Sequence, residues 1–223
     1  MCFSADVDVA AGVVVGAIGI DAMRHARKPP EKLLAAIPLV FAAHQLVEAL
    51  VWWGLEGDVS ESVWRPALYV YLVIAFGVVP VLVPTAVAAL EPAANRWRVN
   101  VLAAMGAVVA VVLMYAVVRG PVEASIEGHH IAYSVDLWSG GLIVALYVVA
   151  TCGSMLLSKH RYVKWFGVIN LVAVGLLVWL SRSGVISLWC LWAAVTSVAI
   201  AVHLRVVNRA DAPAPSGVTR SVS

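Results

Sequence analysis

Two ionisable residues draw attention because they fall within the otherwise apolar segment 41–53. His44 and Glu48 are four residues apart, so on a helix they share one face; Trp52 continues that face and Gln45 lies one helical step aside. A charged side chain at the centre of a bilayer costs about 2.5–3.5 kcal/mol on insertion scales. We therefore expect Glu48 to face the interior of a helix bundle. Such residues generally mark functional sites, although a His44–Glu48 hydrogen bond that only joins helices is the structural alternative.

Further polar side chains fall at a similar depth in the other apolar segments. If those segments pack as neighbours, their polar groups contribute to one pocket that opens toward the same side as Glu48. Each has an ordinary alternative, because tyrosine and serine are common near an interface and Asp136 can cap a helix. The predicted pocket residues are His44, Gln45, Glu48, Trp52, Tyr69 with its neighbour Tyr71, Asp136, Ser139, Asn170, Trp189 and Cys190.

A zinc site is an alternative use of the same region. Zinc accepts thiolate, imidazole and carboxylate ligands, and such groups would meet if the N-terminus and the loop 119–136 folded inward. A zincin helix needs two histidines four residues apart, and the helix with His44 has no second histidine. If zinc were bound, Glu48 would serve as the general base of a hydrolase. The candidate ligands are Cys2, His44, Glu48, His129 and His130.

Two other cofactors fit the sequence poorly. Retinal needs a lysine deep in the last span for its Schiff base, and residues 184–206 contain none. Bis-histidine haem needs two deep histidines, and only His44 is deep. We therefore expect no retinal and no haem.

The elements that carry these residues follow from composition. The chain is 62% hydrophobic and 13% charged, whereas soluble domains are roughly 45–50% apolar and about 25% charged. Its apolar blocks are close to the roughly 20 residues that cross about 30 Å of hydrocarbon, and they lack the alternation of barrel strands. The blocks fall at about 8–23, 33–55, 66–89, 99–118, 137–157, 163–181 and 184–206. The sequence predicts an all-α integral membrane protein, a seven-transmembrane-helix bundle forming one domain over residues 1–207, with a disordered tail at 208–223.

The basic residues predict the orientation of the bundle. Twelve of the 15 Lys and Arg residues fall on one side of the predicted spans, which leaves Arg65, Arg119 and Arg182 on the other. Because short cytoplasmic loops collect Lys and Arg, we expect the N-terminus outside the cell and the C-terminus in the cytoplasm. The net charge of +2 then reflects sidedness in a cell membrane and not nucleic-acid binding. Loop 119–136 would be outside, either as a plain solvated loop or folded over the mouth of the bundle.

Small residues and prolines predict how the helices pack. Gly12, Gly16 and Gly19 lie on one face of the first span, a pattern that allows two backbones to approach closely in lipid. Pro38, and the pair Pro80 and Pro84, fall inside the second and third spans. Each proline removes a backbone donor and crowds the preceding turn, so we expect kinks there.

The order of these features also resembles a known family. The chain opens with Met1-Cys-Phe-Ser-Ala5, continues with a glycine-rich span and a basic loop with Pro29-Pro30, and then carries His44-Gln-x-x-Glu48-x-x-x-Trp-Trp. In these motifs it resembles an uncharacterised bacterial family of multi-pass membrane proteins. The resemblance implies that Cys2 and the His44/Glu48 turn belong to one pattern, and it assigns no catalytic role to any residue.

Three functions agree with these observations. The first is binding, sensing or transport of a small solute, a lipid headgroup or an ion, because the buried acid and imidazole lack a complete catalytic constellation. The second is a metal-dependent hydrolase embedded in the membrane. The third is an accessory subunit whose polar stripe pairs with another membrane protein. The sequence favours the first and leaves the ligand and the oligomeric state open.

Overall fold

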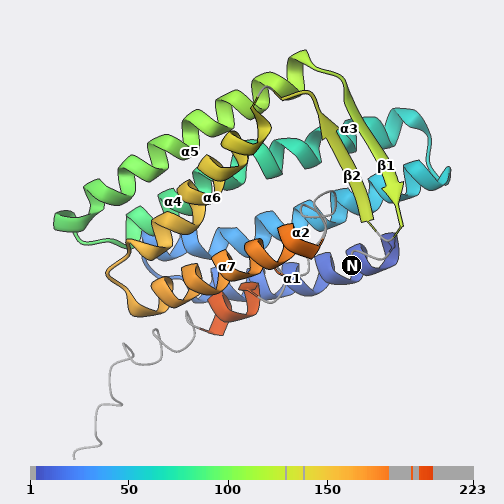
Figure 1. Cartoon of the computed structure of the whole chain (residues 1–223). Helices are drawn as coiled ribbons and strands as arrows, with labels where there is room; N and C mark the ends of the chain where they lie inside the picture. Colours follow the sequence, from blue (N-terminus) through green and yellow to red (C-terminus); the bar gives the residue numbers. More distant parts are fainter. Residues whose placement is uncertain (1–3, 129, 138, 181–191, 193–195, 203–223) are drawn as a thin grey trace, which may run out of the picture.

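The computed structural model describes residues 4–128, 130–137, 139–180, 192 and 196–202, without the side chains of 177–180. Helices account for most of this part of the chain (Figure 1). They are α1 (Ala5–His25), α2 (Pro29–Glu56), α3 (Glu61–Leu72), the π-helical η1 (Val73–Val78), α4 (Val79–Leu90), α5 (Ala93–Arg119), α6 (Gly140–Leu156) and α7 (Arg161–Leu180). Residues 196–202 are also helical. Two strands, β1 (Val122–Glu127) and β2 (His130–Val135), lie between α5 and α6.

Three of the described helical segments are long and apolar enough to cross a membrane. They are Pro29–Glu56, Glu61–Leu90 and Ala93–Arg119, and Gly140–Leu156 is a shorter apolar helix. This is the length and composition expected of a membrane protein. The first six predicted spans fall on α1, α2, α3 to α4, α5, α6 and α7. The seventh, 184–206, and the predicted tail, 208–223, lie largely or wholly outside the described residues.

The mainly helical fold that the sequence predicts is confirmed, but the segment between α5 and α6, which was predicted to be a loop, forms an antiparallel hairpin. Val122 pairs with Val135 at one end and Glu127 with His130 at the other, and Gly128 turns with φ 61°. Ile131 in β2 is completely buried, so the segment is not a plain solvated loop. An isolated two-stranded hairpin is only marginally stable in water, so this hairpin depends for its stability on packing against the helices.

Helices α1 and α2 pack through the predicted glycine face. A Cβ added at Gly12 would lie 2.7 Å from Leu46 Cγ, and one at Gly19 would lie 2.7 Å from Leu39 Cδ2. Gly16 faces Ala42 between these two contacts. The close approach predicted from the small residues is therefore confirmed. Because positions on α2 fall as those on α1 rise, the two helices are antiparallel.

The third span contains a π-helical segment directly before its prolines. The π-helical η1 ends two residues before Pro80, whose ring cannot be accommodated against the carbonyl of the preceding turn of a regular helix. The carbonyl oxygen of Pro80 lies only 1.9 Å from where a Cβ at Gly106 of α5 would be. Gly106 thus allows α5 to approach α4 closely at Pro80. Helix α2, in contrast, continues through Pro38.

Two apolar clusters fill the bundle, one toward each end. The first surrounds the hairpin end and includes Trp52, Leu68, Leu72 and Ile131. The second brings residues near the ends of α1 and α4 together with the start of α5 and the end of α6. The loops after α1, α4 and α6 consequently lie at the end opposite the hairpin (Figure 1).

A buried carboxylate joins two of these loops. Glu91, directly after α4, accepts hydrogen bonds from the hydroxyl of Ser158, from the Lys159 amide at 3.0 Å and from Asn95 Nδ2 at 2.7 Å. Asn95 also donates to the Leu157 carbonyl at 3.1 Å. Burial raises the pKa of Glu91, but the hydrogen bonds that its carboxylate accepts from Ser158, Asn95 and Lys159 lower the pKa by more than burial raises it. The pKa therefore lies below its ordinary value of 4.5. Glu91 thereby ties the α4–α5 turn to the α6–α7 turn as a carboxylate.

Candidate functional site

The polar stripe of α2 is enclosed by protein. Glu48 has no exposed surface, and His44, Gln45 and Trp52 are each buried as well. Pro29–Glu56 presents these four residues from adjacent turns of one helix. Glu48 therefore faces the interior of the bundle, as the cost of placing a carboxylate in lipid requires.

Two tyrosines donate hydrogen bonds to the same oxygen of Glu48. The hydroxyl of Tyr71, from α3, lies 3.2 Å from Glu48 Oε1, and the hydroxyl of Tyr133, from β2, lies 3.3 Å from it. The rings form a column, because His44 stacks on Tyr71 at 3.9 Å and Tyr71 stacks on Tyr133 at 4.5 Å between centroids. Three separate elements thus contribute to one aromatic cluster around the buried acid.

The tyrosine of α3 that contacts Glu48 is Tyr71, whereas the pocket prediction was built mainly on Tyr69. Tyr69 is 41% exposed, whereas Tyr71 is completely buried. Residues two apart on a helix point to nearly opposite sides, so only one of them can face α2. Leu68 and Leu72 are buried on the same side as Tyr71, and this helical periodicity was the signal in the sequence. Tyr133 was missed altogether because the hairpin was not recognised.

The remaining predicted pocket residues lie elsewhere or are not described. Asp136 and Ser139 are exposed after the end of β2. Asn170 is buried in α7, where it donates to the Phe166 carbonyl at 2.7 Å and accepts from Trp192 Nε1 at 2.8 Å. Trp189 and Cys190 lie outside the described residues. The predicted site is therefore reduced, in the described part of the chain, to the α2 stripe with tyrosines from α3 and β2.

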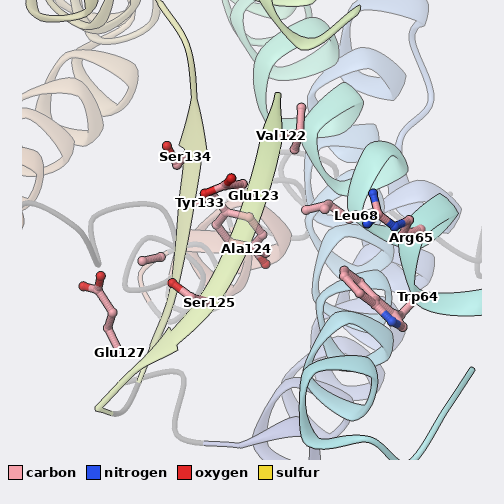
Figure 2. A pocket seen from close by; sticks show the side chains of 11 residues that line it. Trp64, Arg65, Leu68, Val122, Glu123, Ala124, Ser125, Glu127, Tyr133 and Ser134 are labelled. Carbon is pink, nitrogen blue, oxygen red and sulfur yellow. The ribbon is translucent and has the colours of Figure 1, made fainter. Parts of the chain in front are cut away.

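A cavity of about 620 Å³ lies between α3 and the hairpin (Figure 2). Figure 2 shows Trp64, Arg65 and Leu68 on the α3 side of the cavity, with Leu68 pointing toward the strands. Tyr133 belongs both to the wall of this cavity and to the cluster around Glu48. Tyr133 thus connects the buried acid with the lining of the cavity. The hairpin contributes Val122, Glu123, Ala124, Ser125, Glu127, Ala132, Tyr133 and Ser134 to the lining.

Comparison with known families places the chain in one of them. A family model described as a family of unknown function, DUF6629, matches residues 1–216. The chain belongs to the DUF6629 family. The match covers both the α2 stripe and the hairpin, so Glu48 and Tyr133 lie within the DUF6629 region. No curated protein and no solved structure matches the chain. The predicted membership of an uncharacterised family is confirmed, while the bacterial origin and the opening motif stay predictions.

The cavity of this DUF6629 member carries more acidic than basic side chains. Arg65 forms an ion pair with Glu61, one turn earlier on α3, and its guanidinium lies 5.7 Å from the centre of the Trp64 ring. Glu127 lies 3.8 Å from His130 Nε2 across the turn. Glu123 makes no ion pair with any residue that the structure describes. Glu123 is exposed and pairs in register with Ser134, so its side chain lies on the face of the hairpin opposite Tyr133.

The predicted zinc ligands are only partly brought together. His44 and Glu48 share the cluster on α2, whereas His130 pairs with Glu127 on the hairpin. Within the described residues of the DUF6629 chain, no three His, Cys, Asp or Glu side chains are grouped closely enough to hold a metal. Cys2 and His129 lie outside those residues. The zinc site therefore stays a hypothesis that depends on them.

Proposed function

We propose that this chain is a seven-span protein of the cell membrane that binds a small solute in an outward-opening cavity between α3 and the hairpin. In this proposal the solute is sensed or transported through Glu48. The observation that carries it is the double role of Tyr133, whose ring lines the cavity and whose hydroxyl lies 3.3 Å from Glu48 Oε1. A group that enters the cavity and displaces Tyr133 changes the hydrogen bonding of a buried acid.

The distribution of charge supports an outward-facing cavity. The loops after α1, α4 and α6 lie at the end of the bundle opposite the hairpin. These loops and the adjoining turns carry Arg27, Lys28, Arg96, Arg98, Lys159 and Arg161. By the tendency of cytoplasmic loops to collect Lys and Arg, this end would be inside and the hairpin end outside.

The chemistry of Glu48 supports a role in sensing or coupled transport. Its carboxylate accepts from two phenolic hydroxyls and has no exposed surface. An acid at this depth is costly to keep, and a carboxyl that gains or loses a proton when its partners move would couple solute binding to proton movement. A hydrogen bond that only holds helices together could be formed by serine or threonine, at a lower energetic cost in the membrane than a buried carboxylate.

The test is a binding and uptake screen on the purified full chain in proteoliposomes. We compare the wild type with Tyr133→Phe and Glu48→Gln, and Tyr69→Phe serves as the matched control because Tyr69 is exposed on α3. A hydrogen bond to a charged group contributes about 1.5–3 kcal/mol, so loss of the Tyr133 hydroxyl should change solute affinity or uptake roughly tenfold or more. The control should match the wild type. The proposal would be contradicted if neither Tyr133→Phe nor Glu48→Gln changed the binding or uptake of any charged or neutral solute in the screen.

A further inference from the structure

We infer that the junction between the α4–α5 turn and the α6–α7 turn binds the headgroup of an anionic phospholipid, such as phosphatidylglycerol. The junction lies at the end of the bundle opposite the hairpin, so this inference requires a chain in a membrane but no solute in the cavity. Three observations lead to it: the fixed geometry of the junction, its unbalanced positive charge, and two exposed tryptophans at a matching depth.

Hydrogen bonds hold the basic groups of the junction in fixed positions. Glu91 accepts from the Ser158 hydroxyl and from the Lys159 amide, so the two turns form one unit. The guanidinium of Arg96 donates to the backbone carbonyl of Glu91, from Nε at 3.3 Å and from Nη2 at 3.0 Å. Because a carbonyl carries no net charge, this contact orients Arg96 without neutralising it.

The surface of the junction is positive, with no exposed acid to balance it. Glu91 is 1% exposed, and its carboxylate is occupied by hydrogen bonds within the protein. Residues 92–122 and 137–180 contain no further Asp or Glu. The exposed basic residues are Arg96, Arg98, Lys159, Arg161 and Lys164. Among the residues that the structure describes, no carboxylate forms an ion pair with these side chains. Since like charges repel, an anionic group that approaches the junction is attracted by all of them.

Two tryptophans indicate the level of the lipid headgroups at the junction. Trp97 is 62% exposed and Trp165 is 57% exposed. Each lies four residues after the first residue of its helix, which is Ala93 in α5 and Arg161 in α7. A helix rises 1.5 Å per residue, so both rings lie about 6 Å beyond the start of their helices. Tryptophan is enriched at the membrane–water interface, and both helices begin at this end of the bundle.

Basic side chains adjoin both rings. Arg98 follows Trp97, and its guanidinium lies 5.6 Å from the centre of that ring. Lys164 directly precedes Trp165. These charges therefore lie at the depth of the headgroups, where they can bind lipid phosphate through charge-assisted hydrogen bonds. The phosphate of phosphatidylglycerol carries a neutral glycerol, whereas that of phosphatidylcholine carries a cation that the basic cluster repels.

The α1–α2 loop lies at the same end but lacks part of this arrangement. It has three exposed basic residues, Arg24, Arg27 and Lys32. Its fourth, Lys28, lies 3.9 Å from the carboxylate of Glu31. Residues 21–35 contain no Trp, Tyr or Phe to lie among the headgroups. The junction is therefore the preferred site for an anionic lipid, although the two regions carry similar charge.

The test is native mass spectrometry of the purified full chain in detergent, titrated with phosphatidylglycerol or with phosphatidylcholine of the same acyl chains. The junction variant combines Lys159→Gln, Arg161→Gln and Lys164→Gln. It leaves the bonds of Glu91 in place, because Lys159 donates to Glu91 from its backbone amide. The matched control combines Arg24→Gln, Arg27→Gln and Lys32→Gln, which removes the same charge from the same end. Circular dichroism checks that both variants keep their helices.

We expect the wild type to bind phosphatidylglycerol more tightly than phosphatidylcholine, and added salt to weaken this binding. Each Lys or Arg near an anionic lipid surface strengthens binding about fivefold, so loss of three would weaken it roughly a hundredfold if none remained. Arg96 and Arg98 retain part of the attraction, so the junction variant should bind phosphatidylglycerol about tenfold more weakly, or less tightly still. The control variant should lose less than about threefold.

Three results would overturn the inference, and none depends on the solute screen. Equal affinity for the two lipids would exclude recognition of the anionic headgroup. Equal losses in the two variants would show attraction by the net charge of this end, without a site at the junction. Displacement of the lipid by inorganic phosphate at millimolar concentration would assign the junction to a soluble anion.

Discussion

Replacing Glu91 by alanine should destabilise the contact between the α4–α5 turn and the α6–α7 turn. The substitution removes the acceptor of three hydrogen bonds, from Ser158, the Lys159 amide and Asn95 Nδ2. Each buried donor left unsatisfied costs about 1–3 kcal/mol, but Asn95 keeps its bond to the Leu157 carbonyl. We therefore expect a loss of about 3–5 kcal/mol of unfolding free energy, with Glu91→Gln intermediate because it keeps one acceptor oxygen.

The assay is equilibrium unfolding of the purified chain in mixed micelles, followed by circular dichroism, with Glu56→Ala as an exposed-acid control. The pH dependence provides a second readout. Because the pKa of Glu91 is lower in the folded state than its ordinary value of 4.5, its contribution is present above about pH 4.5 and is lost as pH falls through the folded pKa. Glu91→Gln should remove this part of the acid sensitivity. If Glu91→Ala unfolds at the same denaturant concentration as Glu56→Ala, then the hydrogen bonds of Glu91 do not stabilise the contact between the α4–α5 and α6–α7 turns.

Three further predictions concern packing, topology and metal. Gly106→Ala should lower the free energy of unfolding by about 2 kcal/mol or more, because its Cβ would lie 1.9 Å from the Pro80 carbonyl oxygen. Gly153→Ala is the control: its Cβ would make ordinary contacts of 3.4 Å and more, so the free energy of unfolding should change by less than about 1 kcal/mol. Equal effects of the two substitutions would contradict the close packing at Gly106. A cysteine placed at Ser125 on the hairpin should react with an impermeant thiol reagent added outside intact cells, whereas one at Ala94 should react only after permeabilisation; the reverse result would invert the topology. Purified protein should contain less than one equivalent of zinc by elemental analysis, and stoichiometric zinc that His44→Ala removes would instead favour the hydrolase hypothesis.

Glu91 and the hairpin show why part of this molecule could not be predicted from sequence. Glu91 resembles an ordinary interfacial acid, and its importance comes from Ser158, which lies 67 positions away. Strand β1 alternates apolar and polar residues over all six of its positions, from Val122 to Glu127, between Gly120-Pro121 and Gly128, so the sequence did carry a local strand signal. That signal did not reveal which helices the hairpin packs against. Both features depend on contacts between distant parts of the chain.

The residues of α1 and α2 show the opposite case. The helical spans within residues 5–180 were predictable because apolar blocks of about 20 residues match the thickness of a bilayer. The glycine face of α1 and the burial of Glu48 were predictable from helical spacing and from the cost of polar groups in lipid. Which hydroxyls reach Glu48 was not. Tyr133 lies 85 positions from it along the chain, and only the packing of the hairpin against α2 and α3 brings the two together. The positions of small and polar residues specify which face of α1 and α2 turns inward, while the partner that this face meets is decided by how the elements fold against one another.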